Sequence, residues 1–171
     1  MLLSGRAPVR IRRNVEDFGD PYADQESLED YTICSECASV HASGRWYPEG
    51  HFSSKELSNH KCQVVSCPAC RRLRDHVPGG VIKLTGSFIA DHRDEMLNLV
   101  RNEAGKATGA NPLERVMSLE VSNDGEIEIT TTSDKLAQKI GRAIHRAFDG
   151  SVVYKWAGNA RIVRVNWHRD L

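Results

Sequence analysis

The sequence lacks any long apolar run and any excess of charge of one sign. None of its stretches approaches the roughly 18 apolar residues of a membrane-spanning helix. Residues 1–14 carry charge but not the apolar stretch of a secretory signal peptide. We therefore expect a cytoplasmic protein with no membrane partner. Its 23 Lys and Arg residues balance 23 Asp and Glu residues, which excludes the overall positive charge typical of many nucleic-acid-binding proteins.

Sequence signatures of common enzyme classes are also absent. The chain contains no glycine-rich phosphate loop, no nucleophile elbow and no HExxH pair. Its acidic residues and histidines are scattered, and Asp91, His92 and His145 are isolated features on expected helices. We therefore predict a protein that is not an enzyme.

Cysteine is rare in the chain, but four of the five cysteines form two Cys-x-x-Cys pairs, Cys34–Cys37 and Cys67–Cys70. Such a pair places two thiolates on one tight turn, and two pairs supply the four ligands of a closed tetrahedral Zn²⁺ site. The intervening segment 38–66 is longer than the roughly 15–20 residues usual between such pairs. Loop closure costs little extra entropy at this length. The spacing predicts a structural Zn²⁺ site with no open position for a substrate.

Other uses of these cysteines remain open at this stage. A cytoplasmic chain keeps its thiols reduced, which disfavours disulfides. Cys67-Pro68-Ala69-Cys70 also looks like a dithiol redox motif, although a short basic segment ending at Pro78 follows it instead of the expected long helix. A different side chain of the intervening segment could replace one of the four ligands; the candidates are Cys62, His41, His51 and His60.

Composition divides the chain into three parts. Residues 1–30 combine a basic start with an acidic stretch that is poor in apolar residues, and they predict a flexible N-terminal arm. Residues 31–78 hold few large apolar side chains, so we expect a zinc-ribbon-like module that depends on its metal for folding. Residues 79–171 change to alternating and helical apolar patterns.

These patterns predict an α+β fold for residues 79–171. Apolar alternation favours strands at 81–88, 115–121, 126–132, 151–156 and 161–168, and helical spacing favours helices at 91–103 and 133–148. Gly105 and Gly109 are expected to end the first helix. The order β-α-β-β-α-β matches a ferredoxin-like sandwich with both helices on one face of the sheet. The extra C-terminal strand is expected to form a hairpin with its predecessor.

One face of the second predicted helix is basic. At 100° per residue, its four cations fall within an arc of about 60°, and a phosphate backbone could follow them; they are Lys135, Lys139, Arg142 and Arg146. A second basic segment follows the last cysteine and contains Arg71, Arg72 and Arg74. We therefore predict an adaptor that contacts RNA through these residues. A zinc-stabilised adaptor for a protein partner, without nucleic acid, is the alternative.

Three sequence segments carry a family resemblance: 80–86 (GVIKLTG), 126–141 (EIEITTTSDKLAQKIG) and 164–167 (RVNW). Together with the paired cysteines, they resemble the nonsense-mediated-decay-three-like family, whose eukaryotic members are zinc-containing adaptors for export of the large ribosomal subunit. The resemblance implies zinc ligation by Cys34, Cys37, Cys67 and Cys70, and association with ribosomal particles or RNA. Eukaryotic members have further cysteine pairs and a C-terminal extension with transport signals, so we expect a short prokaryotic-type relative without export activity.

Overall fold

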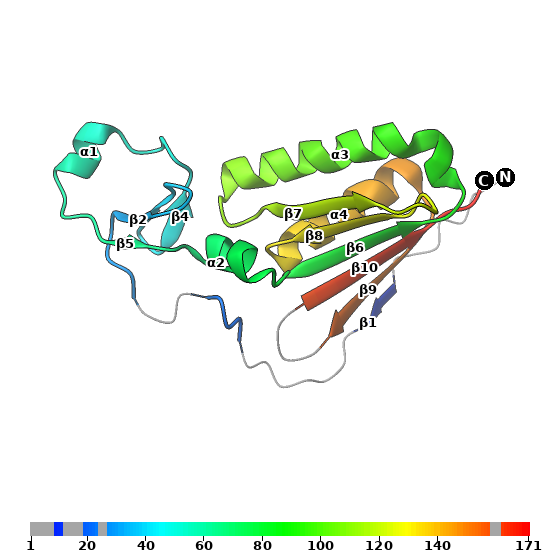
Figure 1. Cartoon of the computed structure of the whole chain (residues 1–171), viewed down its shortest axis with the longest axis horizontal. Helices are drawn as coiled ribbons and strands as arrows, with labels where there is room; N and C mark the ends of the chain where they lie inside the picture. The colour runs from blue at the N-terminus through cyan, green and yellow to red at the C-terminus, as the bar shows by residue number, and fades with distance from the viewer. Residues whose placement is uncertain (1–8, 12–18, 24–26, 158–161) are drawn as a thin grey trace.

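The computed structural model describes residues 9–11, 19–23, 27–157 and 162–171. These residues form an α+β fold with two mixed sheets and four helices (Figure 1). The smaller sheet and two short helices lie at one end of the molecule, beside the larger sheet and the two long helices (Figure 1). Among the described residues, no helix combines the length and the apolar character needed to cross a membrane.

The larger sheet has six strands in the order β1-β9-β10-β6-β8-β7. Strands β6 and β10 are parallel, as are β1 and β9, whereas the other neighbouring strands are antiparallel. The strand bounds are β1 Val9–Ile11, β6 Gly80–Thr85, β7 Val116–Val121, β8 Ile127–Thr131, β9 Ser151–Ala157 and β10 Ile162–His168.

Helices α3 (Phe88–Ala110) and α4 (Asp134–Phe148) pack against one face of this sheet. The apolar side chains of alternate strand residues point toward them, among them Ile82, Ile129 and Trp167, each with no exposed surface. Together the strands and the two helices contribute 18 buried residues to one core. The opposite face is polar, since Lys83, Glu128 and Arg164 lie on it and are exposed.

The strand order agrees only in part with the ferredoxin-like prediction, which is not confirmed. Strands β6, β8 and β7 are neighbours as that arrangement requires, and β9 and β10 form the expected hairpin. However, β10 lies between β6 and β9, where the prediction places β9 directly beside β6. The inward side chains of β10, Val163, Val165 and Trp167, have no exposed surface. A strand so apolar on one face suits a central position in the sheet.

The first long helix differs from its prediction at both ends. Phe88, expected at the end of a strand, is the first residue of α3, because the chain turns at Gly86 with a φ of +110°. A Cβ at Gly86 would lie 2.0 Å from the carbonyl oxygen of Arg169, so only glycine fits this turn. The helix also continues through Gly105 and Gly109 to Ala110, because the buried Ala107 keeps this part of α3 packed on the core.

The second long helix begins and ends as predicted. The Ser133 side chain accepts a hydrogen bond from the backbone N–H of Leu136 and so caps the N-terminus of α4. Asp149 and Gly150 both have positive φ and end the helix. Leu136 and Ile140 face the core without exposed surface. On the same helix, Ala143 is half-buried and Ala147 is exposed.

The smaller sheet has the strand order β4-β3-β2-β5. Strand β2 is antiparallel to β3 and parallel to β5. Two short helices accompany it, and the element bounds are β2 Thr32–Cys34, β3 Val40–Ala42, β4 Arg45–Tyr47, α1 Ser54–Ser58, β5 Val64–Val65 and α2 Pro68–Asp75. We call residues 31–78 the cysteine module. Its zinc-ribbon-like character is not confirmed, because only one cysteine pair lies on a turn between strands and the other begins α2.

Parts of the predicted N-terminal arm are packed against the rest of the chain. Strand β1 pairs with β9, and the Tyr22 hydroxyl donates a hydrogen bond to the Asp75 carboxylate at the end of α2. These parts of residues 1–30 are therefore not a free arm, because backbone pairing and side-chain contacts hold them. Residues 1–8, 12–18 and 24–26 of the predicted arm lie outside the described residues.

Candidate metal centre

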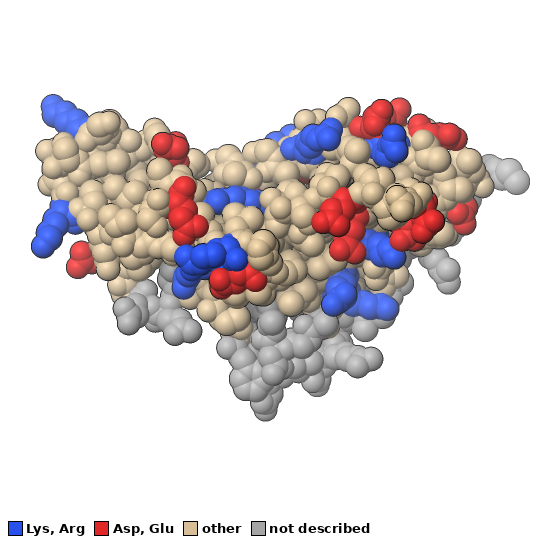
Figure 2. All heavy atoms as spheres, in the orientation of Figure 1, with Lys and Arg blue, Asp and Glu red and all other residues tan. Residues whose placement is uncertain are grey.

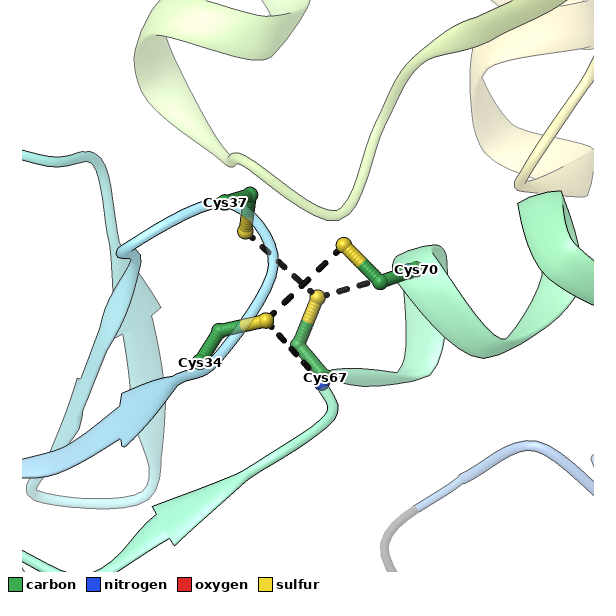
Figure 3. Close-up of side chains that lie close together, drawn as sticks. All are labelled: Cys34, Cys37, Cys67 and Cys70. Atoms are coloured by element: carbon green, nitrogen blue, oxygen red, sulfur yellow. Dashed lines mark hydrogen bonds between the residues drawn. The ribbon is translucent and has the colours of Figure 1, made fainter.

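The four paired cysteines converge on one point, where they could bind a metal ion such as zinc (Figure 3). Their sulfur atoms all lie within 4.8 Å of one another. The sulfurs of Cys34 and Cys70 are 3.8 Å apart, as are those of Cys37 and Cys67. A tetrahedral site with metal–sulfur bonds of about 2.3 Å has sulfur–sulfur edges of about 3.8 Å. These two contacts between the pairs therefore have the length of such an edge.

The first pair lies on a turn between β2 and β3. Cys34 ends β2, and its carbonyl accepts a hydrogen bond from the backbone N–H of Ala38, which has a φ of +58°. This left-handed residue turns the chain back toward β3, so Cys37 faces Cys34 across the turn. The backbone N–H of Cys34 donates to the carbonyl of Ser39 and closes the turn from the other side. The tight turn expected from the first Cys-x-x-Cys pair is therefore present.

The second pair begins helix α2 instead of occupying a tight turn. Cys67 is the N-cap, with extended backbone, and its sulfur accepts a hydrogen bond from the backbone N–H of Cys70 at 3.4 Å. Pro68 follows in the first helical position, which suits its fixed φ. The backbone N–H of Cys67 donates to the sulfur of Cys34 at 3.3 Å. Both N–H groups stabilise negative charge on sulfur.

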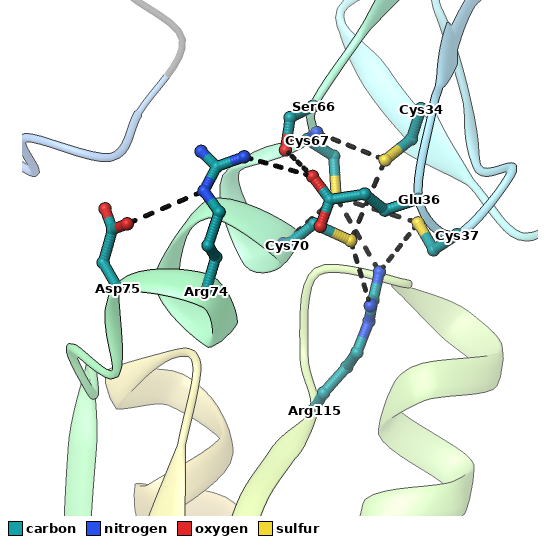
Figure 4. A network of polar contacts seen from close by, with 9 residues as sticks. All are labelled: Cys34, Glu36, Cys37, Ser66, Cys67, Cys70, Arg74, Asp75 and Arg115. Atoms are coloured by element: carbon teal, nitrogen blue, oxygen red, sulfur yellow. Dashed lines mark hydrogen bonds and ion pairs between the residues drawn. The ribbon is translucent and has the colours of Figure 1, made fainter.

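Arg115 reaches the cysteine cluster from the other part of the molecule (Figure 4). It precedes β7, and its Nη2 donates to the sulfur of Cys37 at 3.0 Å, while Nη1 donates to that of Cys70 at 3.5 Å. Nη2 also lies 3.8 Å from the sulfur of Cys67. The guanidinium group thus contacts three of the four sulfurs. No sequence pattern pointed to this residue, because 45 residues separate it from Cys70, the nearest of these cysteines.

Backbone and side-chain bonds hold Arg115 in place. Its Nε donates to the carbonyl of Pro112 at 2.6 Å. Its backbone N–H donates to the Thr132 hydroxyl at 2.8 Å, and its carbonyl accepts from the N–H of Thr132 at 2.9 Å. Leu113, two residues earlier, packs against the apolar residues around the cysteines. The guanidinium is therefore fixed from the side opposite the sulfurs.

The surroundings shift the pKa values of individual thiols in different directions. Burial raises the pKa of Cys37, but hydrogen bonds from Ser39 and Arg115 outweigh it and lower this pKa to about 6. Burial raises the pKa of Cys70 to about 11, although Arg115 opposes this effect. Burial, with the negative charge of the neighbouring cysteines, also raises the pKa of Cys67. A bound metal ion would supply the positive charge that keeps all four sulfurs as thiolates.

The other candidate ligands lie elsewhere. The Cys62 thiol faces backbone carbonyls, with the oxygen of Leu57 at 3.4 Å. His41 is buried and packs edge-to-face on Trp46. His51 stacks on Tyr47, and the remaining candidate, His60, stacks on Tyr31. Within the described residues, none of these four belongs to the group of side chains that could hold the metal.

The four cations of α4 are exposed as the helical spacing predicted. Lys139 also forms an ion pair with the buried carboxylate of Glu114 at 2.6 Å. Within the described parts of the chain, Lys135, Arg142 and Arg146 form no ion pair. We call the surface formed by these three residues and Lys139 the basic face of α4. On the side of the molecule in Figure 2, Lys and Arg residues lie among Asp and Glu residues and do not form one positive field.

The arginines of α2 form contacts within the protein, and their predicted contact with RNA stays a prediction. The side chain of Arg72 is 5% exposed, and its Nη2 lies 2.6 Å from the Asp20 carboxylate. Arg71 donates to the carbonyl of Tyr22 at 3.0 Å. Arg74 is exposed but forms ion pairs with Glu36 at 3.4 Å and with Asp75 (Figure 4). Asp20 and Tyr22 lie against α2 and cover Arg72, so its guanidinium cannot reach a phosphate in this structure.

No protein-family model, curated protein or solved structure gives a significant match to this chain. The resemblance to nonsense-mediated-decay-three-like proteins therefore stays a prediction.

Proposed function

We propose that Cys34, Cys37, Cys67 and Cys70 bind one Zn²⁺ ion in a structural site that holds the cysteine module together. The observation that carries this proposal is the arrangement of the four sulfurs, with two 3.8 Å contacts between the pairs. Four sulfur ligands in tetrahedral geometry select zinc or iron among biological metals. Of these two metals, zinc has no redox chemistry, which suits a structural site beside a small sheet.

The shielding of the sulfurs supports a structural role. Cys34, Cys67 and Cys70 are each at most 4% exposed, so four thiolates would fill the coordination shell without leaving a position for water or substrate. The thiol-redox alternative requires a reactive first cysteine with a lowered pKa. Cys67 has no exposed surface and a raised pKa. The properties of Cys67 thus disfavour a redox role for the second pair.

A cysteine-substitution pair tests the zinc proposal. We would purify the wild-type chain, C67S and C62S without added metal and measure zinc content and reactive thiols with and without a strong chelator. We expect one zinc per wild-type and C62S chain, with four thiols protected until chelation. C67S should lose the zinc. Equal zinc content in C67S and wild type would remove Cys67 from the site, and four freely reactive thiols in the wild-type protein would overturn the proposal.

We further propose that the protein is a non-enzymatic adaptor that contacts RNA or a ribonucleoprotein through the basic face of α4. Three of its cations are exposed and form no ion pair within the described residues, so they keep their full charge for a phosphate backbone. Burial of Arg72 favours α4 over α2 as the contact surface, and the ion pair with Glu114 leaves Lys139 less available than the other three cations. Chain neutrality implies that such binding is weak and sensitive to salt.

The test compares charge reversal on the two long helices. R142E/R146E changes the basic face of α4, and R93E/R101E makes the same charge change on the exposed side of α3. We expect R142E/R146E to lose most co-sedimentation with RNA or ribosomal subunits at low salt, while R93E/R101E loses less. Equal effects would indicate only a dependence on net charge and would remove α4 from the proposal.

One observation favours the alternative, an adaptor for a protein partner. Val64 lies on β5, an edge strand of the smaller sheet, and is 63% exposed. An exposed apolar side chain on an open strand edge suits contact with another polypeptide. Association that survives both high salt and nuclease treatment would favour this alternative over RNA binding.

A further inference from the structure

We propose that Arg115 is a fifth member of the metal centre: its guanidinium compensates charge on the thiolates, and it makes metal retention depend on the larger part of the molecule. This inference rests on the proposed metal site but concerns a residue outside the four ligands. It also assigns residues 79–171 a direct role in a site whose ligands all belong to the cysteine module.

The filled site would carry a net negative charge. Four thiolates and one divalent cation carry a net charge of −2, and three of the four sulfurs belong to almost fully buried residues. Burial of uncompensated charge is costly. Arg115 carries one positive charge directly to the sulfurs, at 3.0 Å from Cys37 and 3.5 Å from Cys70. With Arg115 counted, the net charge of the centre falls to −1.

Arg115 is held in place before it meets the sulfurs. A flexible surface arginine would lose side-chain entropy on docking to the sulfurs, which reduces its net contribution. Here Nε is already bonded to the Pro112 carbonyl, and the backbone is paired with Thr132 at the end of β8. Both Nη groups therefore point at the cysteine cluster from a rigid base. Residues that do not bind the metal but orient its ligands and compensate their charge typically raise metal affinity by 10- to 100-fold.

Arg115 belongs to a different part of the chain from the cysteines. Each of the four cysteines lies in residues 31–78, whereas the loop 111–115 joins α3 to β7 in the larger part. A second arginine bond also joins the two parts, from Nη2 of Arg45 to the carbonyl of Ala110 at 2.7 Å. This bond contacts no sulfur. Both arginines join the two parts, but only Arg115 contacts the sulfurs. Substitution of each one therefore distinguishes charge compensation at the metal from simple contact between the parts.

The experiment compares R115M, R115K and R45M with the wild-type protein, each loaded with zinc. The rate of zinc transfer to a coloured chelator in excess is measured at neutral pH. We expect R115M to release zinc at least tenfold faster than wild type, because the sulfurs lose their cationic partner. R45M should stay within about twofold of wild type, since the Arg45 bond does not reach the metal. R115K keeps the positive charge but lacks the planar guanidinium group, so its rate of zinc release should lie between those of R115M and R45M.

A spectroscopic measurement separates a role at the metal from a general loss of stability. Co²⁺-substituted proteins show a thiolate-to-metal charge-transfer band, and its energy depends on hydrogen bonds to the sulfurs. We expect this band to shift in R115M and to be unchanged in R45M. Should R115M fail to fold, R115K provides the same comparison.

The possible outcomes are distinct. Equal zinc release and an unchanged cobalt band in R115M and R115K would overturn the role of Arg115, even if the wild-type protein holds one zinc. Equal acceleration in R115M and R45M would also overturn it, because contact between the parts would then explain the result. A wild-type protein without metal would overturn the proposed zinc site itself.

Discussion

Removal of the metal should unfold the cysteine module and leave the larger α+β part folded. The two parts have very different cores. The buried cluster around the site has five residues, and three of them are cysteines, whereas the larger core has 18 buried residues. Apart from its cysteines, this cluster contains only Trp46 and Ala69, and Val40 and Ala42 are the other buried apolar residues of the module. We therefore expect the module to depend on a bound ion for its folding, and the larger part to fold without one.

The expected magnitude follows from these contacts. Burial of a large side chain such as that of Trp46 contributes about 3 kcal/mol, whereas zinc contributes about 10–16 kcal/mol in small zinc modules. Two thiolates at the 3.8 Å observed between Cys34 and Cys70 would also repel by about 4 kcal/mol at an effective dielectric constant near 20. In the metal-free protein, the sulfurs must therefore take up protons or move apart.

Hydrogen–deuterium exchange with mass spectrometry, with and without a strong chelator, measures this effect. Peptides from residues 31–78 should lose protection on chelation, including the amides of Ile33, Cys34 and Ser35, which bond across the module. Peptides from β6, β8, β10 and α4 should keep theirs. Chelator that is already saturated with zinc serves as the control. Unchanged protection in residues 31–78 after verified metal loss would refute the reasoning.

Four further substitutions test the packing. W167A should destabilise the larger part by about 3–5 kcal/mol in urea unfolding, because Trp167 has no exposed surface and its Nε1 donates to the Asp149 carbonyl. A destabilisation under 1 kcal/mol would contradict the central place of Trp167 in the core. G105A should stabilise the protein by about 0.5–1 kcal/mol. G141A should destabilise it, because a Cβ there would lie 2.7 Å from Val165 Cγ1. A change of stability in the same direction for both substitutions would contradict the packing of α4. T132V should cost about 1–3 kcal/mol, since the buried Thr132 hydroxyl bonds Leu113 and Arg115; unaltered stability would show that these bonds do not hold the loop.

Local patterns predicted most elements of the larger part. The capping residue Ser133 and the stop at Asp149-Gly150 defined α4 correctly, because both signals act within one turn of helix. The predicted helix end at Gly105 was wrong, since nothing in the local sequence shows that Ala107 is buried against the core. The place of β10 between β6 and β9 is a property of the whole sheet, and alternation along one strand does not encode it.

The candidate site shows the same division between local and distant information. The spacing of Cys34, Cys37, Cys67 and Cys70 predicted their convergence, because each pair fixes two ligands locally. Arg115 was missed, since its role arises from tertiary packing of the loop before β7. Arg72 was misjudged for the same reason: its basic neighbours suggested an exposed surface, but Asp20, 52 residues away in sequence, covers it.

X-ray absorption at the metal edge, combined with elemental analysis of the purified chain, tests the central proposal most directly. We expect one zinc per chain, with a first shell of four sulfurs at about 2.3 Å. A chain without bound metal, or a metal whose first shell contains nitrogen or oxygen in place of one of the four sulfurs, would contradict the four-cysteine centre.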